Sequence, residues 1–110
     1  MTDRSLSTQV FQILLSLADQ DLHGFAIIQD VAERTDGEVR LTASTLYAAV
    51  KRLLDQGLID EVSSRTRDDD PRRRYYHLTP VGRKTARDEA LRLERLAAMA
   101  RAKRLLPSTR

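Results

Sequence analysis

Residues 41–61, LTASTLYAAVKRLLDQGLIDE, predict a capped amphipathic helix that is followed by a strand. Thr42 is placed to act as the N-cap, where its hydroxyl accepts a hydrogen bond from an amide of the first turn. Gly57 fits the position just past the helix, where glycine adopts a positive φ at little cost. At about 100° per residue, the inner side would carry Leu46, Ala49, Val50 and Leu53, and the outer side Ser44, Ala48, Lys51 and Asp55, flanked by Thr45, Tyr47 and Arg52.

The sequence after this helix predicts a β-hairpin and then a long helix. Residues 58–62 and 74–78 can pair as antiparallel strands around a loop at 63–73, which contains the turn-forming run DDDP. Thr79 and Pro80 are the favoured N-cap and first residue of a helix that nothing interrupts until about residue 105. Tyr75 and Tyr76 alternate on the second strand, so we expect one ring to be buried and the other partly exposed.

Two more helices are expected before residue 41, at about 7–18 and 23–34, with Ser7 or Thr8 capping the first and His23 beginning the second. Polar and apolar residues alternate over residues 38–41, which is enough for a very short strand or an extended link. A short surface helix backed by a hairpin is the local plan of a winged helix-turn-helix. The predicted fold is mainly α (α+β): a winged helix-turn-helix with a two-stranded β wing and a long C-terminal helix.

Length and composition narrow the functional class. At 110 residues the chain should form one domain, and its lack of cysteine excludes disulfides and thiolate metal sites. No apolar run approaches the roughly 18 residues that cross a bilayer, so we expect a cytoplasmic protein with no membrane partner. His23 and His77 fit no metal-ligand spacing, and there is no glycine-rich phosphate loop or GxSxG elbow. We therefore expect no enzymatic activity, no metal and no cofactor.

Charge is unevenly distributed along the chain. Residues 1–71 contain 7 basic and 13 acidic side chains, a net charge of −6, whereas residues 72–110 contain 12 and 3, a net charge of +9. This asymmetry is compatible with a polyanionic partner, but a solvated basic helix explains much of it as well.

The outer face of the 42–56 helix is the candidate DNA-binding surface. Recognition helices meet bases with their first turns and phosphates with flanking groups. An ordinary helix with a solvated outer face is the alternative, and the arginines of the hairpin could instead protect an edge strand. Because Asp68 to Asp70 would repel phosphate, we expect the flanks of the wing to touch DNA. The candidates are Thr42, Ser44, Thr45, Tyr47, Lys51, Arg52, Arg72, Arg73 and Arg74, with Arg65 and Arg67 also on the hairpin.

The helix at 80–105 is too long and too apolar on one side to be buried by so small a domain. A two-fold dimer would cover it, although it could also pack back on the first helix of its own chain. We expect residues 1–79 to form the DNA-binding domain and residues 80–110 the dimerisation helix. The predicted interface consists of Phe11, Leu15, Leu93, Leu96, Ala97 and Ala100. A winged-helix module that binds protein instead of DNA is the alternative function.

Three segments together resemble the PadR family of transcriptional regulators: HGFAIIQDVAERT, LTASTLYAAVKRLLDQGLIDE and RRRYYHLTPVGR. The resemblance covers nearly the whole chain and places the family's recognition helix on residues 42–56, with Tyr47 in its LY pair. It implies a winged helix-turn-helix, a single C-terminal helix that forms a homodimer, and repression at an operator with inverted symmetry. It also implies relief of repression by a small ligand or a stress signal.

Two features depart from the family pattern. Phe25 stands where family members commonly have tyrosine after the HG pair, so a polar contact made by that hydroxyl is missing. The chain contains no tryptophan, and some short members hold flat aromatic drugs against a tryptophan at the dimer interface. A small-molecule effector pocket between the protomers would instead be lined by Phe11, Leu15 and Met99.

Overall fold

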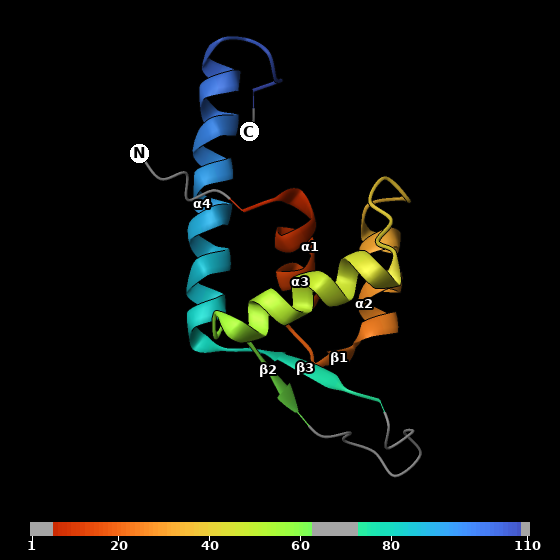
Figure 1. Ribbon diagram of the computed structural model, residues 1–110. Coiled ribbons are helices and arrows are strands. Elements are labelled where there is room, and N and C mark those ends of the chain that lie inside the picture. Colours follow the sequence, from red (N-terminus) through yellow and green to blue (C-terminus); the bar gives the residue numbers. More distant parts are fainter. Residues whose placement is uncertain (1–5, 63–72, 109–110) are drawn as a thin grey trace.

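The computed structural model describes residues 6–62 and 73–108. In chain order it contains α1 (Thr8–Ser16), β1 (Leu22–His23), α2 (Gly24–Arg34), α3 (Ala43–Asp55), β2 (Ile59–Val62), β3 (Tyr75–Leu78) and α4 (Pro80–Ala102) (Figure 1). This order confirms the predicted mainly helical fold, in which a helix and a hairpin are followed by a long C-terminal helix.

The sheet has three strands rather than the two that were predicted. All neighbours are antiparallel in the order β1-β3-β2, and Leu22 pairs with Tyr76 at the added strand. β1 has two residues, too few to show an alternating pattern in the sequence. His23 belongs to β1 and also caps α2 by accepting a hydrogen bond from the Ala26 amide at 3.2 Å, so the second helix begins at Gly24.

Local capping signals account for the other boundaries. Ser7, Thr42 and Thr79 each accept a hydrogen bond from an amide in the first turn of the helix that they precede. Gly57 has a φ of 73°, and the Leu58 amide bonds the Leu53 carbonyl, a glycine C-cap as predicted. Residues 38–41 form an irregular link to α3 that bends at its start, and not the very short strand that the alternation allowed. The ends of α1 and α4 come earlier than predicted, at Ser16 and Ala102.

One apolar core joins the first three helices to the sheet. Tyr76 is only 3% exposed and adds its ring to this core, whereas Tyr75 is half-buried, as the alternation predicted. The largest fully buried apolar side chains are Ile13, Leu14, Ile27, Val31, Leu46 and Ile59. Burial of the inner face of α3 aims its opposite face at solvent.

The first half of α4 packs on the same core, and its second half does not. The Arg83 guanidinium donates to the Ala18 carbonyl at 2.8 Å, and the Leu6 amide donates to the Glu89 carboxylate at 3.3 Å. Beyond α1 the helix extends past the rest of the molecule, which gives a longest dimension of 52 Å (Figure 1).

Candidate nucleic-acid interface

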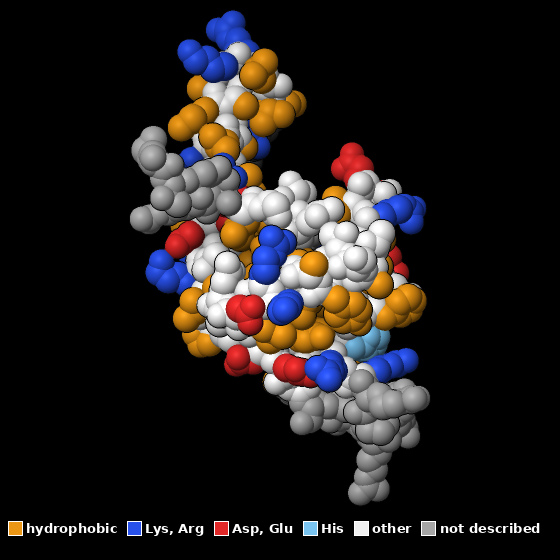
Figure 2. Space-filling view, viewed as in Figure 1, with side chains coloured by type: hydrophobic (Ala, Val, Ile, Leu, Met, Phe, Trp, Pro, Cys, Tyr) orange, Lys and Arg blue, Asp and Glu red, His pale blue; other side chains and the backbone are white. Residues whose placement is uncertain are grey.

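The outward face of α3 is open to solvent along its whole length. Ser44, Ala48, Lys51 and Asp55 lie along its centre and are all exposed, as the helical spacing predicted. Figure 2 views the molecule from this side and shows basic side chains over the middle of α3 with an acidic one beside them. The face thus presents short side chains first, then a cation, and an acid at its C-terminal end.

Two of the hydroxyl groups that were predicted to contact DNA, those of Thr42 and Thr45, take part in the N-terminal cap of α3. The Thr42 hydroxyl accepts a hydrogen bond from the Thr45 amide at 3.1 Å and donates to the Thr45 hydroxyl at 3.0 Å. Thr45 is half-buried on the flank of the helix, while Ser44 points outward. Of these three candidates, Ser44 therefore offers the most accessible hydroxyl to a ligand.

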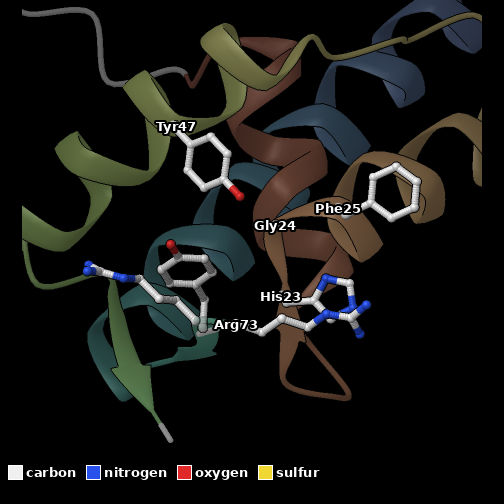
Figure 3. A pocket seen from close by; sticks show the side chains of 7 residues that line it. His23, Gly24, Phe25, Tyr47 and Arg73 are labelled. Carbon is white, nitrogen blue, oxygen red and sulfur yellow. The ribbon is translucent and has the colours of Figure 1, made fainter. Parts of the chain in front are cut away.

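Tyr47 and Arg52 lie on opposite flanks of the outward face. Tyr47 faces the start of α2, and its hydroxyl lies so close to Gly24 that a Cβ at that glycine would collide with it (Figure 3). Arg52 lines a separate pocket of about 420 Å³ together with Ser7 and Val10 at the start of α1. The two predicted phosphate-binding side chains therefore border the face on both sides.

An open pocket of about 750 Å³ lies between the N-terminal half of α3, the start of α2 and the β3 side of the wing. Figure 3 shows Tyr47 reaching into it from α3, with His23 and Gly24 below, at the junction of β1 and α2. The remaining lining residues are Phe25, Arg73, Arg74 and Tyr76. The sequence prediction does not assign His23, Gly24 or Tyr76 to the site. The HG pair, a capping residue followed by glycine ahead of an apolar helical repeat, could have indicated His23 and Gly24.

Burial raises the pKa of Tyr76, and the neighbouring Tyr47 and Glu61 raise it further, while Arg74 opposes them. The Tyr76 hydroxyl therefore stays protonated and remains a neutral donor at this pocket. Such a donor can bond an anionic oxygen without adding negative charge beside it.

The wing combines both signs of charge. Arg73 and Arg74 are exposed just before β3, and the Arg74 Nε lies 3.4 Å from a Glu61 carboxylate oxygen on β2. This ion pair is open to water and therefore contributes little to stability. Arg72, Arg65, Arg67 and the acidic run at 68–70 lie outside the described residues.

The predicted dimer and effector residues lie on α1 and α4, which pack side by side. On α4, Leu93 and Leu96 are exposed and Ala97 and Ala100 are half-buried, so an apolar strip continues past the body of the molecule. Met99 is 61% exposed. On α1, Phe11 is half-buried and Leu15 is exposed.

Within residues 6–62 and 73–108, no group of three or more His, Cys, Asp or Glu side chains could hold a metal ion. No helix in the same part of the chain is long and apolar enough to span a membrane.

Comparison with known proteins agrees with this architecture. Residues 13–88 match the model of the PadR-like family, which consists of transcriptional regulators rather than enzymes. An uncharacterised protein from Lysinibacillus sphaericus is 30% identical over 71 residues, and the match covers 64% of this chain and 64% of that protein.

Several solved structures share the fold. A transcriptional regulator from Clostridium thermocellum is 27% identical, with a TM-score of 0.71 over 88% of this chain and 96% of that one. A PadR family regulator from Clostridium difficile is 27% identical, with a TM-score of 0.74 over 84% and 94%. Bacillus subtilis PadR in complex with operator DNA shares the fold at 23% identity, with a TM-score of 0.64 over 74% of this chain and 46% of that one. Since the family model spans well over half of its residues, this chain belongs to the PadR-like family of transcriptional regulators.

Proposed function

We propose that this protein is a cytoplasmic repressor that binds an inverted-repeat operator in double-stranded DNA as a homodimer. The observation that carries the proposal is the exposed polar and basic face of α3 beside the wing, in a chain of a family of transcriptional regulators. A surface helix held by its apolar side on a small core has the form that enters a major groove.

The proposed contacts follow the geometry of α3 and its flanks. The first turns of α3 would face base edges, and the flanking and wing residues would bind phosphates, which fix the register and supply salt-dependent affinity. The base-facing group is Ser44, Thr45 and Lys51, with Thr42 as the cap beside it; the phosphate-binding group is Tyr47, Arg52, Arg72, Arg73 and Arg74.

The outer half of α4 supports the homodimer. Leu93 and Leu96 are exposed on a helix that extends past its own domain, and a second copy would bury them together with Ala97 and Ala100. Phe11 and Leu15 of α1 would join this contact. In this assignment residues 1–79 bind DNA and residues 80–110 dimerise.

A small-molecule effector would bind between the protomers, against Phe11, Leu15 and Met99. The exposure of Leu15 and Met99 in the single chain supports this placement, because a second copy would enclose both side chains. Addition of such a ligand should weaken operator binding and leave the dimer intact.

The test is duplex binding by fluorescence anisotropy across a range of salt concentrations. The wild type should lose affinity steeply with salt, and Lys51→Glu/Arg52→Glu should bind more weakly, with a slope shallower by about 0.9 for each phosphate that the variant no longer neutralises. Lys84→Glu/Arg87→Glu makes the same charge change on α4 and is the control. If the α3 variant binds as the wild type does, α3 is not the DNA-binding helix, and the protein-binding alternative gains support. A reporter gene downstream of the bound sequence should show reduced transcription.

A further inference from the structure

The outward face of α3 carries a restricted set of chemical groups, and this limits which bases it can distinguish. Asn, Gln and Arg are absent from residues 42–51, which leaves Lys51 as the one side chain in that stretch that can grip a purine edge with two hydrogen bonds. Ala43, Ser44 and Ala48 are all exposed in the first two turns. Lys51 is the first long polar side chain on the centre of the face.

The structure reduces the available hydrogen bonds further. Thr42 and Thr45 use their hydroxyls on each other and on the helix cap, and Thr45 is half-buried. What remains central and accessible is the Ser44 hydroxyl and the methyl group of Ala48, one turn apart. Because both side chains are short, the backbone of α3 can approach the floor of the groove closely.

The charges at the ends of α3 indicate which part enters the groove. Asp55 is exposed at the C-terminal end of the face, where it would repel a phosphate or a guanine edge. Tyr47 borders the N-terminal half, and the pocket beside it carries Arg73 and Arg74. The half of α3 that contains Ala48 is therefore the half that meets the bases.

We infer that Ala48 recognises the 5-methyl group of a thymine in each half-site. Thymine is the base that presents an apolar group in the major groove, and an alanine methyl is a matching partner for it. The inference rests on the proposed function, since it concerns the sequence preference of the same surface. Specificity would come from apolar contact at Ala48, with Ser44 and Lys51 adding polar contacts above and below.

The experiment starts from duplexes enriched out of a random pool by the full-length protein. Each thymine of a half-site is replaced in turn by deoxyuridine, which removes the methyl group and keeps every hydrogen-bonding group. With the wild type, one such replacement should raise Kd about fourfold, the effect of burying one methyl group. With Ala48→Gly the same replacement should leave Kd unchanged.

Each protein is measured on the thymine duplex and on the matching deoxyuridine duplex. Any general loss of affinity caused by glycine in α3 therefore cancels in the ratio of the two Kd values. Wild-type tolerance of deoxyuridine at every thymine would overturn the inference while leaving DNA binding in place. An equal loss of affinity with wild type and Ala48→Gly would also overturn it, because another residue would then contact the methyl group. Failure to enrich any duplex would overturn both the inference and the proposed function.

Discussion

Gly82 shows at the scale of a single residue how α4 is joined to the wing. It lies in the first turn of α4 against the Leu58 carbonyl, and a Cβ built there would overlap that oxygen. The Thr79 hydroxyl donates to the Gly57 carbonyl at 2.7 Å and caps the same turn. The start of α4 is therefore seated directly on the chain that leaves α3.

Replacing Gly82 by alanine should destabilise the protein by about 1–3 kcal/mol, the cost of overpacking against a backbone atom that cannot move aside. Helix propensity alone predicts the opposite sign, a gain of about 1 kcal/mol. Urea unfolding measures the difference. Gly57→Asn is the control, because nothing lies within 4 Å of a Cβ there and asparagine tolerates positive φ. A Gly82→Ala protein as stable as the wild type would contradict the packing described here.

Tyr47 provides the matching test at the proposed interface. Its hydroxyl lies beside Gly24, next to the wing pocket, where a DNA phosphate would receive its hydrogen bond. Tyr47→Phe should raise the Kd for an enriched duplex about tenfold, since hydrogen bonds to charged groups contribute roughly 1.5–3 kcal/mol. The ring is retained, so the urea midpoint should not change. Unchanged DNA affinity would remove Tyr47 from the phosphate-binding group.

At the scale of helices and strands, a contact that joins α1 to α2 is made by the Arg34 side chain. Its guanidinium donates to Asp30 at 2.8 Å on its own helix and to Gln12 and Ser16 on α1, both at 2.7 Å. Burial alone would raise the pKa of Asp30, but the hydrogen bonds from Arg34 and Ser16 and the Arg34 charge outweigh it and lower that pKa. Because α2 packs against α3, this contact helps to hold the proposed DNA-binding face in place.

Asp30→Asn should therefore destabilise the protein in a pH-dependent way. Because the folded-state pKa lies below the ordinary value of 3.8, the stabilisation is fully present above that value and is lost as the pH falls through the folded pKa. At pH 7 the loss of stability should be about 0.5 kcal/mol, since the pair is partly exposed. Urea unfolding at pH 7 and at successively lower pH measures both proteins. If the difference in unfolding free energy between wild type and Asp30→Asn stayed constant over that pH range, the lowered pKa assigned to Asp30 would be contradicted.

The elements that local signals define were predictable, and those that depend on distant contacts were not. Thr42, Gly57 and Thr79 mark helix ends through their own chemistry, so three boundaries followed from the sequence. The strand at Leu22–His23 exists because β3 lies beside it, and two residues carry no pattern of their own.

The same distinction applies to the candidate site. Helical spacing was enough to predict that Ser44 and Lys51 share the outward face of α3. The hydrogen bond between the Thr42 and Thr45 hydroxyls depends on rotamers, and the pocket between Tyr47 and His23 depends on how α3 packs against α2. Neither can be obtained from periodicity.

At the scale of the whole molecule, α4 makes the shape elongated and leaves an apolar surface uncovered. Figure 2 shows hydrophobic side chains gathered on the part of α4 that extends past the core. Leu96 is 47% exposed there and Leu93 is 39% exposed. A second copy would cover this surface and would bring two recognition helices onto one face of the DNA.

Leu96→Glu should therefore produce a monomer at concentrations where the wild type is a dimer, as measured by sedimentation equilibrium. Operator affinity should fall at least about 100-fold, because two linked half-site contacts become independent ones. Leu91→Glu is the control, since this leucine is similarly exposed at 44% but lies about 140° away around the helix. Loss of the dimer in the Leu91 variant but not in the Leu96 variant would place the interface on another face of α4.

The most direct test of two-fold DNA recognition is the symmetry of the sequences that the full-length protein enriches from a random duplex pool. Two α3 helices in a symmetric dimer should select inverted half-sites whose centres are about 34 Å apart, roughly one turn of B-DNA. Lys51→Glu/Arg52→Glu should enrich no such site. Enriched sequences without inverted symmetry, or no enrichment by the wild type, would contradict recognition of an operator by a dimer of this protein.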